Sequence, residues 1–144
     1  MVNIEDKQGL FRDKSLLIVD DDNPFRERLS RAMEKKGFIV SQAEGVKSAI
    51  NVVKIKKPAF AVVDLRLADG NGLEVVKEIQ RLKLNSRIIM LTGYGNIPTA
   101  VAAIKEGAID YLAKPADADD VEKALLANPN EKPKPPENPM SADR

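Results

Sequence analysis

Short apolar runs alternate with amphipathic segments through most of this chain. Five runs rich in Leu, Ile, Val and Phe occur at 16–19, 38–40, 60–63, 88–91 and 109–112. Three of them (LLIV, FAVV and IIML) are apolar throughout instead of alternating, which is typical of parallel strands covered by helices on both faces. We therefore predict five β-strands.

The intervening segments repeat apolar residues at helical spacing, and several are bounded by residues that start or end helices. The predicted apolar faces are Phe25, Leu29, Ala32 and Met33; Val46, Ala49, Ile50 and Val53; Val75, Ile79 and Leu82; Ile97, Val101 and Ile104; and Val121 and Leu125. Strict strand–helix alternation predicts an α/β fold, a (βα)5 doubly wound parallel sheet. Right-handed crossovers limit the strand order to a few choices, and among them we expect the flavodoxin-like order 2-1-3-4-5, in which the first and third strands are neighbours.

The length of 144 residues indicates one domain, which we place at 15–128. Residues 1–14 form an N-terminal extension in this interpretation. Five of the nine prolines fall within 129–144, where apolar residues are scarce, so this segment is predicted to be a linker. We expect the natural protein to continue beyond it into a further domain.

Composition removes several function classes. Hydrophobic residues make up 43% of the chain, charged residues 31%, and the net charge is +1, which argues against a large non-specific nucleic-acid surface. The chain has no Cys and no His, so thiolate, imidazole and zinc-finger chemistry are excluded. No signal peptide or membrane-spanning run is evident, and we expect a soluble, cytoplasmic protein that does not contact a membrane.

Polar residues of four kinds follow four of the predicted strands. Asp20, Asp21 and Asp22 follow the first strand, and Asp64 follows the third. Thr92 and Lys114 follow the fourth and fifth strands. The carboxyl ends of parallel strands share one edge, so these side chains are expected to converge there. Each residue alone is easily explained as a turn, cap or surface residue, but their joint placement indicates a site.

Clustered carboxylates resist joint ionisation, and a hard cation such as Mg²⁺ relieves the conflict because it prefers oxygen ligands. A carboxylate beside such an ion can attack phosphorus. The charge on a transferred phosphoryl group could then be met by Mg²⁺, the Lys114 ammonium, the Thr92 hydroxyl and backbone amides.

The segments LLIVDDD, VVDLRLADGNGLEV, IIMLTGYG and IDYLAKPAD, in this order and spacing, resemble the receiver domains of two-component response regulators. The resemblance implies that Asp64 accepts a phosphoryl group from a partner sensor histidine kinase in a phosphorelay. The implied Mg²⁺ ligands are Asp20, Asp21, Asp64 and the Arg66 backbone carbonyl. Such a domain is a phosphoprotein that catalyses at most its own dephosphorylation, and is not otherwise an enzyme.

The same resemblance assigns roles at the ends of the fourth and fifth strands. Thr92 and Lys114 would hold the phosphoryl oxygens, and the Lys114–Pro115 peptide bond would be cis. On phosphorylation the Thr92 hydroxyl would move inward and Tyr111 would rotate into the space left. The surface of the fourth helix, fifth strand and fifth helix would then change shape and control an output domain.

Narrower segments, including RAMEKKGF, LTGYGNIPTAVAAIKEGA and PPENPMSADR, are similar to the redox-responsive RegA/PrrA/ActR regulators. That similarity implies a C-terminal helix-turn-helix domain, absent from this chain, through which the full-length protein binds DNA and regulates transcription. A homodimer formed on phosphorylation would use the fourth-to-fifth-helix surface, with Lys105, Asp110 and Lys123 as candidate contacts. One departure is Ala68, where many receivers have Pro, and we expect a more mobile 66–72 loop and altered dephosphorylation.

Three other functions compete with this interpretation. Asp20-x-Asp22 also resembles the start of Mg²⁺-dependent aspartyl phosphatases of the haloacid-dehalogenase type, with Asp20 as nucleophile, although the later paired acids of that family are missing. A nucleotide-binding module is disfavoured because the first turn, DDDNP, lacks glycines and would repel a pyrophosphate. A receiver that serves only as a docking surface is the third alternative.

Overall fold

The computed structural model describes residues 13–93 and 97–127, and all structural statements below concern these residues. At the centre lies a five-stranded parallel sheet in the order β2-β1-β3-β6-β7. Its strands are β1 (Ser15–Val19), β2 (Ile39–Ala43), β3 (Phe60–Asp64), β6 (Arg87–Thr92) and β7 (Asp110–Ala113). Since β6 and β7 are the fourth and fifth strands of this sheet, the predicted order 2-1-3-4-5 is confirmed.

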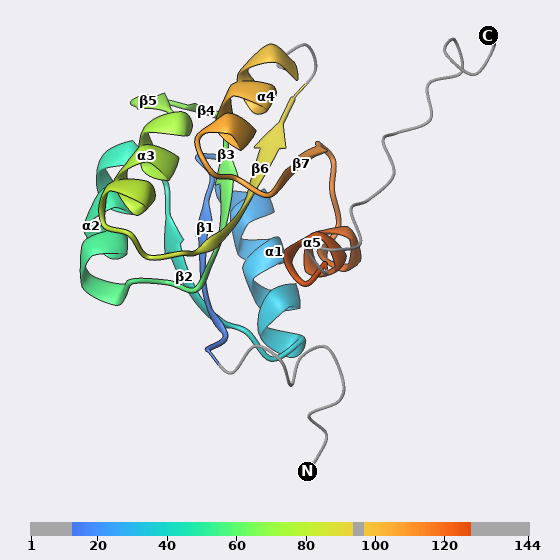
Figure 1. The fold of residues 1–144 in the computed structure, drawn as a ribbon. Helices are drawn as coiled ribbons and strands as arrows, with labels where there is room; N and C mark the ends of the chain where they lie inside the picture. The colour runs from blue at the N-terminus through green and yellow to red at the C-terminus, as the bar shows by residue number, and fades with distance from the viewer. Residues whose placement is uncertain (1–12, 94–96, 128–144) are drawn as a thin grey trace, which may run out of the picture.

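Helices cover both faces of the sheet (Figure 1). They are α1 (Asn23–Lys35), α2 (Val46–Lys56), α3 (Leu73–Arg81), α4 (Ile97–Lys105) and α5 (Ala118–Leu125). The helices α1 and α5 pack on one face, and α2, α3 and α4 on the other. This is the doubly wound architecture that the alternation of strand and helix patterns predicted.

The strands feed two separate cores because successive side chains point to opposite faces of a sheet. In β1, Leu16 and Ile18 face the α1–α5 layer, whereas Leu17 and Val19 face the α2–α3–α4 layer. All four side chains are almost completely buried. This explains why the run LLIV is apolar at every position.

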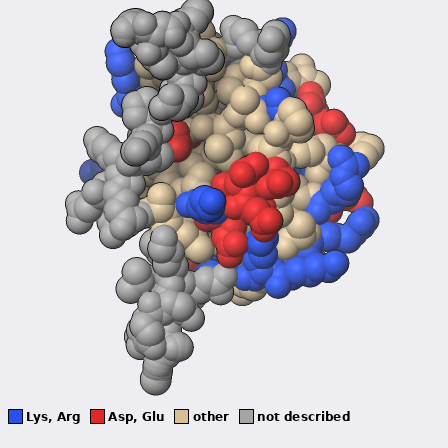
Figure 2. Space-filling view, turned by 90° about the vertical axis from the view of Figure 1, so that its right-hand side faces the viewer, with Lys and Arg blue, Asp and Glu red and all other residues tan. Residues whose placement is uncertain are grey.

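Acidic residues start the helices that flank the site. Asp22 caps α1 by accepting a hydrogen bond from the Phe25 N–H, and Asp117 caps α5 by accepting one from the Asp120 N–H. Such caps satisfy backbone donors that have no partner within the helix. On the side of the molecule that carries α5, acidic side chains gather at the centre of the face with basic ones along its border (Figure 2).

A small antiparallel pair, β4 (Arg66–Leu67) and β5 (Gly70–Asn71), stands at the end of β3 and was not predicted from the sequence. Strands of two residues carry too little periodicity to be recognised. The pair turns at Ala68 and Asp69, and it occupies the loop that was expected to be mobile. Its mobility stays a prediction.

The residues predicted to share an apolar face of α4 do share one, but this face does not point into the core. Ile97, Val101 and Ile104 are 45%, 42% and 37% exposed, whereas Ala100 and Ala103 are fully buried. The helix therefore packs on the sheet through its small residues. The second strand differs from the predicted run at 38–40, because it begins at Ile39 and extends to Ala43. Phe38, just before it, packs edge-on against Phe60.

Most of the predicted extension and all of the predicted linker, 129–144, lie outside the described residues. Within the part of the chain that the structure describes, no helix is long and apolar enough to cross a membrane.

Candidate functional site

The end of β1 delivers a buried carboxylate to the edge of the sheet. Asp20 is completely buried, and its backbone N–H donates to the Ala43 carbonyl of β2. Its Oδ1 accepts a hydrogen bond from the Asp22 N–H at 2.9 Å. The turn thus fixes the Asp20 carboxylate, while the next residue, Asp21, is exposed.

The end of β3, which is the neighbour of β1, delivers the second buried carboxylate. Asp64 is 7% exposed, and the Arg66 N–H donates to its Oδ1 over 3.4 Å. This bond keeps the Arg66 backbone next to the cluster. Carboxylate oxygens of Asp20, Asp21 and Asp64 all lie within 4.8 Å of one another. Three oxygen donors at this separation suit a hard divalent cation such as Mg²⁺.

Lys114, from the end of β7, reaches into the acidic cluster. Its Nζ lies 2.9 Å from Asp20 Oδ2 and 3.3 Å from Asp64 Oδ2, so one ammonium bridges two carboxylates. The contact with Asp20 is an ion pair, and Asp20 Oδ2 is a buried oxygen that has no other polar partner among the described residues. A buried oxygen in this condition is open to a further positive ligand, which supports the fit of a metal ion.

The electrostatics of the cluster favour binding of positive charge. Burial and the neighbouring Asp20 charge raise the pKa of Asp64 from 3.8 to about 6, although Lys114 opposes this rise. Burial by itself would lower the pKa of Lys114, but the hydrogen bond and charges of the two carboxylates outweigh it and raise that pKa. Three carboxylates and one ammonium thus share the site, whose net charge is negative when the acids are ionised.

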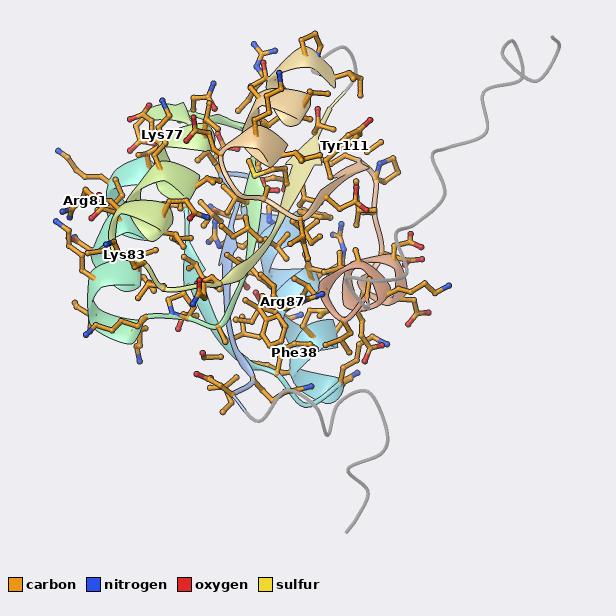
Figure 3. The ribbon with its side chains drawn as sticks, viewed as in Figure 1. Phe38, Lys77, Arg81, Lys83, Arg87 and Tyr111 are labelled. Atoms are coloured by element: carbon orange, nitrogen blue, oxygen red, sulfur yellow. The ribbon has the colours of Figure 1, made fainter. Side chains whose placement is uncertain are left out.

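Thr92 and Tyr111 lie on the same side of the sheet. Thr92 is completely buried at the end of β6, and its hydroxyl donates to the Gly93 carbonyl at 3.0 Å. Tyr111 pairs with Met90, two residues before Thr92, and packs half-buried against the core on the α4 side. Side chains two apart on a strand share a face, so both residues face the α4 layer. Figure 3 shows Tyr111 on β7 near α4.

The Lys114–Pro115 peptide bond is cis, and Ala116 follows it as a buried residue. The backbone N–H of Lys114 donates to the Thr92 carbonyl at 2.9 Å, which ties the ends of β6 and β7 together. The structure therefore brings Asp20, Asp64 and Lys114 into contact at one edge of the sheet.

Two further residues that support the site were missed at the sequence level. Arg26 of α1 is buried, and its guanidinium donates to the Asp20 carbonyl, Asn23 Oδ1 and Gln42 Oε1 at 2.7–2.8 Å. Phe25 places its ring 4.9 Å from Lys114 Nζ, a favourable cation–π distance. An Arg beside the apolar face of a helix is usually a surface residue, so only the folded neighbourhood identifies its role.

A parallel sheet of this order, with acids at the ends of its two central strands and a lysine from the edge strand, defines a class of proteins. Residues 16–126 match the model of the response regulator receiver domain. The chain therefore belongs to the response regulator receiver domain family.

Relatives of known role refine this result. The photosynthetic apparatus regulatory protein RegA of Rhodobacter capsulatus is 58% identical over 140 residues, 97% of this chain and 76% of RegA. The acid tolerance regulatory protein ActR of Rhizobium meliloti is 60% identical over 132 residues, 92% of this chain and 68% of ActR. These identities support the predicted RegA/PrrA/ActR group, whose members named here are regulatory proteins longer than the matched region.

Solved structures agree. A Burkholderia pseudomallei response regulator, described as having a phosphorylated aspartic acid, a calcium ion and citrate, superposes with a TM-score of 0.76 at 39% identity, covering 83% of this chain and 70% of that one. FixJ-N gives a TM-score of 0.73 at 29% identity, covering 87% of this chain and all of FixJ-N. The haloacid-dehalogenase alternative is not favoured by any of these similarities.

Proposed function

We propose that this chain is a phosphoryl-accepting switch in which Asp64 receives a phosphoryl group from a partner sensor histidine kinase with the help of Mg²⁺. The observation that carries the proposal is the bridge of Lys114 Nζ between Asp20 and Asp64, within a cluster of three carboxylates. An ammonium held against the acceptor can meet a phosphoryl oxygen as it arrives.

In the proposed reaction an Asp64 carboxylate oxygen attacks phosphorus, and the bond from phosphorus to the donor breaks with its electron pair leaving on the donor. For a histidine kinase that donor atom is an imidazole nitrogen. Lys114 and the Thr92 hydroxyl would then each bind a phosphoryl oxygen. Asp20, Asp21, Asp64 and the Arg66 backbone carbonyl would hold Mg²⁺, which supplies charge neutralisation when bound.

The aspartyl phosphate formed is an acyl phosphate, so hydrolysis of its P–O bond by water returns Asp64 and inorganic phosphate. We infer that the domain accelerates this hydrolysis through the same cluster and has no other substrate. Ala68, four residues after Asp64, lies at the turn of the β4–β5 pair next to the site. Exchange of this residue is expected to change the phosphoryl lifetime.

The proposed output follows from the position of Thr92 and Tyr111 on the α4 side of the sheet. Withdrawal of the Thr92 hydroxyl toward a phosphoryl group would free space for Tyr111, and the α4–β7–α5 surface would change shape. We infer that this surface controls a C-terminal helix-turn-helix domain through the 129–144 linker. It includes Lys105, Asp110 and Lys123, through which the phosphorylated form would make a homodimer. We infer that the protein acts in the cytoplasm, where it would meet both its kinase and its DNA target.

The direct test is the intact mass of this chain after incubation with Mg²⁺ and a small phosphodonor. One added phosphoryl group that requires Mg²⁺ and is absent from Asp64→Asn is the expected result. Phosphorylation that survives in Asp64→Asn but is lost in Asp20→Asn would favour the phosphatase mechanism. Absence of any adduct, with Mg²⁺ shown to bind, would leave a docking module.

A further inference from the structure

Asp69, at the turn of the β4–β5 pair, binds the first turn of a helix that is distant in sequence. Its Oδ1 accepts a hydrogen bond from the Val46 N–H at 2.7 Å, and its Oδ2 accepts one from the Lys47 N–H at 3.1 Å. Both bonds lower the pKa of Asp69, so the group is a carboxylate at neutral pH. The two oxygens satisfy two of the backbone donors that every helix leaves free at its start.

The start of α2 is built to receive this carboxylate from another loop. Its N-cap residue is Gly45, which has no side chain to offer, and Gly45 is buried beneath Asp69. A Cβ on Gly45 would lie 2.6 Å from Asp69 Oδ1. That distance is far below van der Waals contact, so any larger residue would push the carboxylate away. Gly45 and Asp69 therefore form a matched pair.

The segment that Asp69 anchors begins two residues after the phosphoryl acceptor. Its first residue is Arg66, whose N–H donates to Asp64 Oδ1, and it ends where the Gly72 N–H donates to the Leu65 carbonyl at 2.8 Å. The ends of the segment are thus fixed at the site, and among the hydrogen bonds of the described residues only those of Asp69 join its turn to α2.

The turn also borders a hollow next to the carboxylate cluster. This hollow has a volume of about 440 Å³. Asp21, Asn23, Gly45, Ala68 and Asp69 are among the residues that line it. Without the bonds from Asp69 to α2, the turn could swing across open space, and Ala68 adds no ring that would stiffen it.

We propose that Asp69 is a positioning residue for the metal site: by binding the start of α2 it holds the Arg66–Asn71 hairpin so that the Arg66 backbone carbonyl and the Asp64 carboxylate face the same cation. This inference rests on the proposed function, and it names a residue that touches neither metal nor phosphoryl group. Outer residues that orient ligands in this way typically contribute about 10- to 100-fold to metal affinity.

The test measures the affinity of the whole chain for Mn²⁺, used in place of Mg²⁺ because free Mn²⁺ is counted by electron paramagnetic resonance. Asp69→Ala is expected to weaken Mn²⁺ binding by about tenfold. Gly45→Ala should produce a similar loss, because the new methyl group displaces the carboxylate. The double variant should be no weaker than either single variant, since both act on one contact.

Two variants separate positioning from simple helix capping. Asp117→Ala removes the carboxylate cap of α5 and serves as the matched control, with lower thermal stability but unchanged Mn²⁺ affinity expected. Asp69→Asn keeps one acceptor oxygen, so its affinity should lie between those of wild type and Asp69→Ala.

The outcomes are distinguishable. If wild type binds Mn²⁺ and Asp69→Ala binds it equally well while melting at a lower temperature by circular dichroism, Asp69 is only a helix cap and the inference fails. Losses that add fully in the double variant would also overturn it. If wild type itself binds no Mn²⁺, the failure belongs to the proposed function, and the inference falls with it.

Discussion

At the scale of single residues, Asp64 combines two requirements that conflict. In the proposed reaction it must be ionised to attack phosphorus, yet its burial and the neighbouring charge of Asp20 raise its pKa to about 6. Lys114 only partly offsets the repulsion. The metal-free protein therefore carries its acceptor at a cost to its own stability, which is common at sites that bind a cation.

We expect Asp64→Asn to stabilise the metal-free protein at pH 7.5. The pKa in the folded chain, about 6, exceeds the ordinary value of 3.8, so the stabilising effect of Asp64 is complete below pH 3.8 and is lost as the pH rises through 6. An amide avoids this loss, and the gain at pH 7.5 should be on the order of 1–3 kcal/mol. Urea unfolding in EDTA at pH 7.5 and pH 4.5 measures it.

The gain should shrink at pH 4.5, where wild-type Asp64 is largely protonated in the folded chain. Added Mg²⁺ provides the control, because it should stabilise wild type more than the variant, which lacks one carboxylate ligand. If wild type and Asp64→Asn had the same unfolding free energy at both pH values, the raised pKa of Asp64 would be contradicted.

Two glycines near the site differ sharply in the space around them. A Cβ on Gly72 would lie 2.2 Å from the Asp64 carbonyl oxygen, a backbone atom that cannot move away cheaply. A Cβ on Gly93 would meet no atom of the described residues within 4 Å. We expect Gly72→Ala to cost roughly 3 kcal/mol or more and Gly93→Ala to cost under about 1 kcal/mol. Chemical denaturation of both variants tests this, and equal costs would refute it.

The sequence predicted the residues that form the acidic cluster better than the residues that hold them in place. Asp20, Asp64 and Lys114 could be found because each directly follows an apolar strand, and strand ends of a parallel sheet converge. Arg26 and Asp69 could not be found, because their partners are distant in sequence: Gln42 of β2 for Arg26 and the first residues of α2 for Asp69. Local patterns carry no signal for such contacts.

At the scale of secondary-structure elements, burial on both faces explains which strands were predictable. The central strands β1, β3 and β6 are buried throughout or nearly so, and their sequences are continuously apolar. The edge strand β2 includes exposed and half-buried positions, and its polar residues Ser41 and Gln42 concealed its true end at Ala43. Edge strands need less apolar sequence because one side is open to water.

Helix α4 shows a second limit, since periodicity identifies the faces of a helix but not which face is buried. The larger residues Ile97, Val101 and Ile104 share a face, yet the helix approaches the sheet through Ala100 and Ala103. Small residues allow close approach of a helix, and the larger apolar face is left half-exposed on the proposed output surface.

The stability cost of a substitution in α4 should therefore depend on which face carries it. We expect a larger cost at the buried small residues than at the larger, half-exposed apolar residues. Ala103→Leu adds volume to a fully buried position and should cost about 1–3 kcal/mol through overpacking. Val101→Ser removes an apolar group that is 42% exposed and should change stability by about 0.5 kcal/mol or less. Thermal unfolding of both variants measures this. A larger loss in Val101→Ser would show that its face is buried after all.

At the scale of the whole molecule, long-range contacts join the ends of the domain to its centre. Arg87, at the start of β6, donates from Nε to the Leu125 carbonyl at 2.7 Å and also binds the Ala127 carbonyl. Figure 3 shows this side chain directed at the end of α5. Lys36, at the end of α1, pairs with Asp119 and Glu122 of α5. The C-terminal helix, from which the proposed linker departs, is thus fixed to the sheet and to α1.

These contacts hold α5 against the sheet and α1, and in the proposed switch we expect the signal to pass from the site to the output surface through Tyr111. We predict that Tyr111→Ala still gains one phosphoryl group by intact mass, since Tyr111 contributes no group to the acidic cluster. Wild type should show altered amide hydrogen exchange across 97–113 on phosphorylation, and the variant should lose most of that response. Ile55→Ser, at an exposed position of α2 outside the proposed output surface, is the matched control and should respond as wild type does. Loss of phosphorylation in Tyr111→Ala, or an unchanged exchange response, would remove Tyr111 from the switch.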